Sequence, residues 1–220
     1  MDSKGHEFLT NESVAQAVKD FPPSLNWVRY FLRDTLVGSV YRDTTDIFTR
    51  GHWTEEGQRH HFMRFQGQPL ADAYDAGSKW IYDNAYTAAQ RLREIWQKKR
   101  GYYDPVYINE PLGDAIHALQ DSYSGGHVVR QKDGDSFIIV NILVYDDDNK
   151  EAHGDWPGHA ALDKRWKTDE LGKEAIIAGR ELIRIVVASS LVKNDTELWP
   201  RWNSLWATFV SLFLVCKFQR

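Results

Sequence analysis

The sequence predicts a mainly α, single-domain helical bundle with long loops. Apolar residues recur at helical spacing in several segments, and prolines separate some of these segments. The composition, 42% hydrophobic and 26% charged, is ordinary for a globular protein. At 220 residues the chain can bury one large core, so one domain covering 1–220 is expected.

The first 70 residues predict two helices and a long loop. Helices are expected over 7–20 and 24–37, separated by Phe21-Pro22-Pro23, because proline cannot continue a helix. Residues 38–70 are rich in Gly, His, Thr and Arg and lack a clean period. We expect them to form a long ordered loop, and such loops in compact domains are usually functional.

Three helices and one strand are predicted further along. The pattern is clearest over 71–99, where the apolar and small residues run from Ala73 to Trp96, and a shorter helix is expected from Pro111 to about Tyr123, with the proline near its first turn. Residues 137–145 are an apolar run of strand length that ends at an Asp-rich turn, and 170–191 is again helical.

The longest apolar run, 205–216, predicts a core helix or strand, because its 12 residues are too few to span a bilayer. An alternative is a peripheral membrane contact, since Trp199 and Trp202 lie just upstream and Trp206 lies within the run. No classical export signal is encoded at the amino terminus. This leaves the location open between the cytoplasm and export by a leaderless route.

Charge and cysteine content exclude several functional classes. The net charge of −4 gives no basic footprint, which argues against a dedicated duplex-DNA binder. Cys216 is the only cysteine, so an intrachain disulfide and a thiolate zinc site are both excluded. A metal centre in this chain would have to use imidazole and carboxylate ligands.

One short segment has this ligand pattern. His117 and Asp121 are four residues apart, which places them on the same face of a helix. The Ser124-Gly125-Gly126 segment then ends the helix and can fold His127 back toward that face. Imidazole nitrogen and carboxylate oxygen are the zinc ligands used when thiolates are absent. The segment therefore predicts a metal site.

Candidate ligands elsewhere extend this site. The chain repeats the His-x-x-x-Asp spacing at His159 and Asp163, and His153 is an alternative to His159. His60 and His61 compete for another position. The full candidate set is too large for one tetrahedral zinc and suits two or three ions that share a carboxylate. It consists of His6, Asp43, His61, His117, Asp121, His127, His159 and Asp163.

These ordered motifs resemble the zinc-dependent phospholipase C family of alpha-toxin-type enzymes, whose superfamily includes single-strand-specific zinc nucleases. The resemblance covers about residues 6–163 and consists of four motifs. They are Gly-Ser-x-Tyr-x-Asp ending at Asp43, His-Phe at 61, His-x3-Asp-x5-His at 117, 121 and 127, and Gly-His-x3-acid at 159 and 163. It implies a mostly α-helical fold with a multinuclear zinc site at one end.

The resemblance also implies a distribution of ligands over three ions. Asp43, His61, His117 and Asp121 would hold one, and His127, His159 and Asp163 the second. The third would lie between His6 and the bridging Asp121. Family members complete it with an amino-terminal Trp, whereas this chain begins Met1-Asp2. Either the Met1 amine replaces that Trp, or the third ion is weakly or otherwise held.

The implied activity is phosphodiester hydrolysis by a zinc-activated water, with Asp43 as the carboxylate that orients or deprotonates this water. Phospholipid is the expected substrate, because the chain also has an apolar, Trp-rich tail. A single-strand nuclease using the same site is the alternative. A third hypothesis is a non-enzymatic fold in which the ions only tie loops together.

Overall fold

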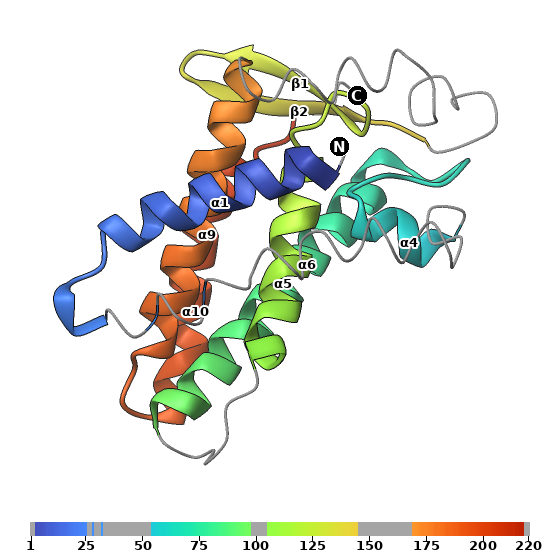
Figure 1. Ribbon diagram of the computed structural model, residues 1–220. Coiled ribbons are helices and arrows are strands. Elements are labelled where there is room, and N and C mark those ends of the chain that lie inside the picture. The colour runs from blue at the N-terminus through green and yellow to red at the C-terminus, as the bar shows by residue number, and fades with distance from the viewer. Residues whose placement is uncertain are drawn as a thin grey trace.

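The computed structural model describes residues 3–25, 28, 32, 54–97, 105–144 and 169–217, and it confirms a mainly α fold (Figure 1). The helices are α1 (Ser3–Lys19), α4 (Glu55–His60), α5 (Leu70–Trp96), α6 (Pro105–Asp121), α9 (Glu170–Ser190) and α10 (Asp195–Phe213), with a 3-10 turn, η1, at Pro23–Leu25. The strands are β1 (Val128–Asp133) and β2 (Ser136–Ile142).

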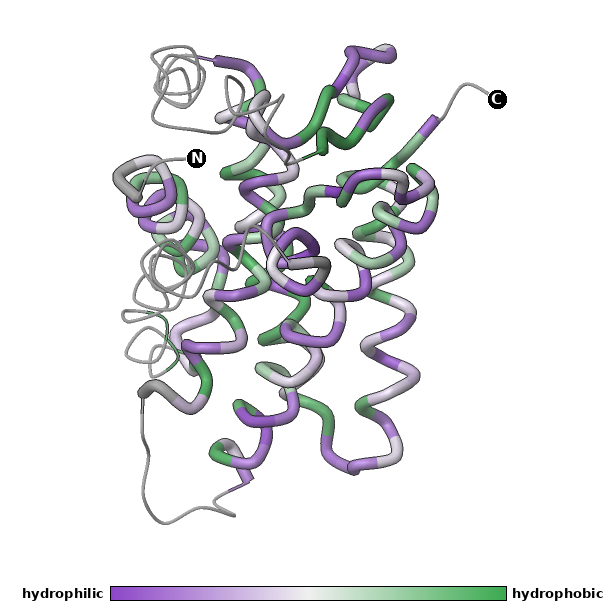
Figure 2. Tube along the Cα trace, turned by 90° about the vertical axis from the view of Figure 1, so that its right-hand side faces the viewer, coloured by the Kyte–Doolittle hydropathy of each residue, from purple (hydrophilic) through white to green (hydrophobic). Residues whose placement is uncertain are grey.

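Helix α9 lies at the centre of the bundle and contacts α1, α5, α6 and α10. The predicted helix 170–191 is confirmed, and its Ala175, Ile183 and Val187 are buried. The long helices alternate between hydrophilic and hydrophobic residues along their turns (Figure 2). This alternation gives each helix one apolar face, and burial of those faces is the main force that holds the bundle together.

The predicted helix 71–99 is confirmed as α5. Ala73, Ile81, Ala85 and Leu92 form its buried stripe, as the periodicity indicated. The last tryptophan of the pattern is an exception, because Trp96 is 46% exposed at the end of the helix. The helical repeat therefore identified the buried face but not the point at which the helix leaves the core.

Helix α6 carries the predicted metal motif and begins earlier than expected. Pro111 lies inside the helix, so the prediction that it begins the helix was wrong. Proline removes the N–H that would bond to the carbonyl four residues earlier, here that of Tyr107. The guanidinium of Arg91 donates to this same Tyr107 oxygen at 2.6 Å. A side chain of α5 thus replaces the missing helical hydrogen bond.

Helix α1 confirms the predicted helix 7–20 and starts four residues sooner, which brings His6 into it. It crosses α9 closely at Gly179, where an added Cβ would lie 2.5 Å from the hydroxyl oxygen of Ser13. That hydroxyl donates to the Leu9 carbonyl at 2.7 Å and also lies 3.1 Å from the Ile176 carbonyl. The crossing fixes the position of α1 on the bundle.

Of the predicted helix 24–37, the structure describes residues 24, 25, 28 and 32, and Val28 and Leu32 are buried.

The predicted strand 137–145 corresponds to β2, which pairs antiparallel with β1. No strand was predicted at β1, because most of its side chains are exposed and give no apolar period. The hairpin turn contains Gly134 at φ +64°, a left-handed conformation that glycine adopts without strain. The Asp-rich segment 146–149 lies outside the described residues.

Two further segments differ from expectation. The predicted loop 38–70 contains the short helix α4, which begins after Thr54, whose hydroxyl accepts the N–H of Gly57 at 2.9 Å. Residues 38–53 of that loop lie outside the described residues. Residues 205–213 of the apolar run form the end of α10. Phe209, Phe213 and Leu214 of the run are buried, as is Trp202 just upstream, in agreement with the core alternative. Trp199 is 53% exposed. No helix among the described residues is long and apolar enough to cross a membrane.

Candidate metal centre

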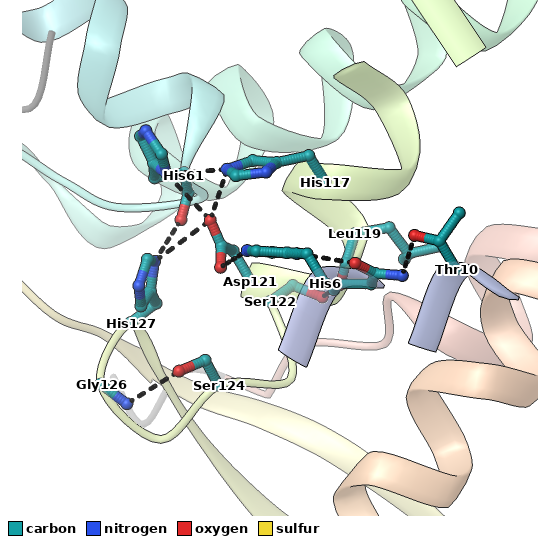
Figure 3. A network of polar contacts seen from close by, with 11 residues as sticks. His6, Thr10, His61, His117, Leu119, Asp121, Ser122, Ser124, Gly126 and His127 are labelled. Carbon is teal, nitrogen blue, oxygen red and sulfur yellow. Dashed lines mark hydrogen bonds and ion pairs between the residues drawn. The ribbon is translucent and has the colours of Figure 1, made fainter. Parts of the chain in front are cut away.

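Four imidazoles surround the carboxylate of Asp121, which is fully buried at the carboxyl end of α6 (Figure 3). His117 comes from the preceding turn of the same helix, His6 from α1, and His61 from the end of α4. His127 lies in the turn between α6 and β1. None of these side chains is more than 1% exposed. Segments up to 121 residues apart in the sequence therefore meet at one carboxylate.

The motif in α6 has the geometry that its spacing predicted. His117 Nε2 lies 3.1 Å from Asp121 Oδ2. After the helix ends, the N–H groups of His127 and Val128 both donate to the Ser124 carbonyl, at 3.0 and 2.9 Å. This turn folds His127 back, so that its Nδ1 lies 3.7 Å from Asp121 Oδ2.

The structure distinguishes the two adjacent histidines. His61 ends α4 and places its Nδ1 2.9 Å from Asp121 Oδ2. His60 points elsewhere and stacks on Trp80, with ring centroids 3.7 Å apart. The next residue, Phe62, has φ +52°, and its ring packs so closely on Gly77 that an added Cβ would lie 2.7 Å from it. We infer that this contact fixes the chain direction that turns His61 toward Asp121.

Three donor atoms have the spacing of a metal coordination shell. His61 Nδ1, His117 Nε2 and Asp121 Oδ2 form a triangle with sides of 2.9, 3.0 and 3.1 Å. In a tetrahedral zinc site, ligands about 2.0–2.1 Å from the ion lie about 3.3 Å from one another. The triangle is thus close to one face of such a tetrahedron.

The other oxygen of Asp121 faces a different imidazole. Its Oδ1 lies 3.2 Å from His6 Nε2, and the His6 ring stacks on that of His117 with centroids 4.1 Å apart. Ligand atoms of His6, His117 and Asp121 lie within 4.8 Å of one another, as do those of His61, Asp121 and His127. Asp121 belongs to both groups, so the cluster can hold a metal ion and has the bridging carboxylate that two ions would share.

Hydrogen bonds fix which nitrogen each of two imidazoles offers. His6 Nδ1–H donates to the amide oxygen of Gln120 at 2.7 Å, and His127 Nδ1–H donates to the backbone carbonyl of His61 at 2.7 Å. When these rings are neutral, each keeps a lone pair on Nε2. Metal-binding histidines characteristically donate their other ring N–H to a carboxylate or carbonyl in this way.

The electrostatics of the cluster favour a cation. Burial raises the pKa of Asp121, but the positive charges of the neighbouring His127, His117 and His6 outweigh burial and hold this pKa well below its usual range. The carboxylate is therefore ionised inside the protein. A buried carboxylate needs a compensating positive charge, which either a protonated imidazole or a bound metal ion supplies.

Five of the predicted ligands are brought together, namely His6, His61, His117, Asp121 and His127. The other three, Asp43, His159 and Asp163, lie outside the described residues, as does His153. Sequence reasoning missed Gln120 and Thr10, which support His6 from outside the cluster. The only sequence signal for Gln120 is its place next to Asp121, and Thr10 has none.

Comparisons of the chain with family models, with curated proteins and with solved structures find no match.

Proposed function

We propose that this protein is a metal-dependent phosphodiester hydrolase, namely a zinc-dependent phospholipase C. The observation that carries the proposal is the carboxylate of Asp121, whose two oxygens face different imidazoles in a fully buried cluster. A carboxylate that bridges two ions is characteristic of hydrolytic two-metal sites, which bind both the attacking and the leaving oxygen of a phosphodiester.

Zinc is the proposed metal because of the donor set. The cluster offers four imidazoles and one carboxylate, and the chain's single thiol, Cys216, is not part of it. Imidazole-rich sites suit zinc, whereas magnesium and calcium prefer oxygen ligands alone. When bound, zinc ions polarise the phosphodiester and make water nucleophilic near neutral pH.

The proposed roles of the residues follow from their positions. His61, His117 and Asp121 would hold one ion, and Asp121 with His6 would hold another. His127 would offer Nε2 as a ligand to a further ion, since its Nδ1–H donates to the His61 carbonyl. Asp43, His159 and Asp163 complete the set in the proposal, with Asp43 orienting the attacking water. The four motifs of the phospholipase C family supply these last assignments.

Phospholipid is the proposed substrate over nucleic acid, because a chain with net charge −4 has no excess positive charge to bind a polyanionic strand. The exposed Trp199 and Leu212 on α10 would suit an apolar partner.

The test is hydrolysis by the zinc-loaded protein. We expect phosphocholine release from phosphatidylcholine vesicles, loss of release with EDTA or in His117→Ala, and retention in His60→Ala, whose ring lies outside the cluster. Denatured DNA is assayed in parallel. Cleavage of DNA without phosphocholine release would replace the lipase with the nuclease. Absence of both activities, with zinc bound, would leave a purely structural metal site.

A further inference from the structure

We propose that Gln120 is a positioning residue that decides whether the gap between His6 and Asp121 holds a metal ion or a proton. It acts by fixing the tautomer of His6, and Thr10 accepts a hydrogen bond from the amide nitrogen of Gln120. This inference rests on the proposed function only in that it concerns the same metal centre.

The gap is ambiguous without Gln120. His6 Nε2 and Asp121 Oδ1 are 3.2 Å apart, a distance that suits an N–H···O hydrogen bond. If His6 carried its proton on Nε2, this hydrogen bond would close the gap and leave no lone pair for an ion. If the ring is neutral and its proton is on Nδ1, the lone pair of Nε2 faces the Asp121 carboxylate, and the gap can take a metal ion. The tautomer therefore selects between the two states.

Gln120 selects the second state. Its amide nitrogen donates to the Thr10 hydroxyl oxygen at 2.9 Å, and its amide oxygen faces His6. This oxygen lies 2.7 Å from His6 Nδ1 and can only accept, so Nδ1 must carry the proton. A chain of contacts therefore runs from Thr10 through Gln120 and His6 to Asp121. Figure 3 labels Thr10, His6 and Asp121 of this chain.

The surroundings keep this chain rigid. Thr10, Gln120, His6 and Asp121 are all 0% exposed, so water cannot replace any of its partners. His6 and Thr10 are one turn apart on α1, and Gln120 and Asp121 are neighbours on α6. The chain therefore also joins these two helices at the metal centre. Residues that orient a metal ligand from outside typically change metal affinity 10–100-fold when replaced.

The experiment compares Gln120→Met, Gln120→Glu and Thr10→Val with the wild-type chain. Methionine has a similar size but cannot accept from Nδ1, whereas glutamate keeps an acceptor there. One measurement is zinc binding by calorimetry with metal analysis. The other is the ¹⁵N NMR signature of the His6 ring in the zinc-free protein, which reports the tautomer without any activity assay.

We expect Gln120→Met to weaken the less tightly bound ion 10–100-fold and to move the His6 proton to Nε2. Gln120→Glu should keep both wild-type properties, and Thr10→Val should weaken the same ion by less than Gln120→Met. If Gln120→Met does not fold, the comparison of Gln120→Glu with Thr10→Val decides, because only the valine variant should bind that ion more weakly.

Three results would overturn the inference. They are an unchanged His6 tautomer and ion affinity in Gln120→Met, equal losses in Gln120→Met and Gln120→Glu, and a wild-type chain that binds fewer than two ions. A wild-type chain that binds two ions but releases no phosphocholine would contradict the hydrolase and leave the role of Gln120 intact.

Discussion

Replacement of Asp121 by Asn tests the metal centre most directly. Asparagine has nearly the same shape, but it is neutral and is a far weaker metal ligand than a carboxylate. Asp121 lies within 2.9–3.7 Å of a nitrogen of each of four imidazoles, so both ions of the proposed centre depend on it. We expect Asp121→Asn to bind neither ion at concentrations that saturate the wild type.

The size of the effect follows from the number of ligands. Structural zinc sites with four ligands contribute about 10–16 kcal/mol of apparent binding free energy, or about 3 kcal/mol per ligand. Loss of one ligand thus weakens binding more than about 100-fold. A ligand at 100 times its Kd stabilises a folded protein by about 2.7 kcal/mol, which at this chain length corresponds to a rise in Tm of roughly 5–11 °C.

The assay is thermal unfolding with EDTA and with zinc at 100 times the wild-type Kd. The wild type should show this rise in Tm, and Asp121→Asn should show a rise of at most about 2 °C, because a site weakened 100-fold is only half filled at this zinc concentration. The matched control is Asp114→Asn, because Asp114 is also a buried aspartate of α6 but lies outside the cluster. Equal stabilisation of wild type and Asp121→Asn, or equal loss in Asp114→Asn, would refute the reasoning.

Further predictions concern single positions and pH. Zinc binding should be lost in His61→Ala and kept in His60→Ala, as measured by calorimetry; the reverse result would contradict the assignment of His61. Gly179→Ala should destabilise the protein by about 1–3 kcal/mol in urea unfolding, because its methyl group would collide with Ser13. Zinc should dissociate as the pH falls, because protonated imidazoles cannot bind metal; an inductively coupled plasma measurement after dialysis at each pH tests this. Burial raises the pKa of Tyr123, so the folded state retains a proton that the unfolded state loses above pH 10. Stability should therefore be unaffected by this group below pH 10 and decline above it, and urea unfolding across that range would reveal any opposite trend.

Periodicity alone predicted the helices that have one apolar face. The stripes of α5 and α9 recur every three to four residues, and this repeat places them on one side of a helix. Periodicity failed to predict where α6 begins, because a side chain from another helix replaces a hydrogen bond there. Pro111 lies within α6 although it has no N–H to donate to the Tyr107 carbonyl. Arg91, twenty residues earlier, donates to that carbonyl instead. Strand β1 was missed because its mostly exposed side chains give no apolar signal.

For the metal centre, the sequence by itself determined the local geometry. The four-residue spacing of His117 and Asp121 and the turn before His127 place three ligands together, because backbone geometry fixes such short distances. Only the tertiary structure decided that His6 and His61 join them, and that His60 does not. The physical reason is that these contacts depend on how helices pack, through the Gly179 crossing and the Phe62–Gly77 contact, and no local pattern encodes that packing.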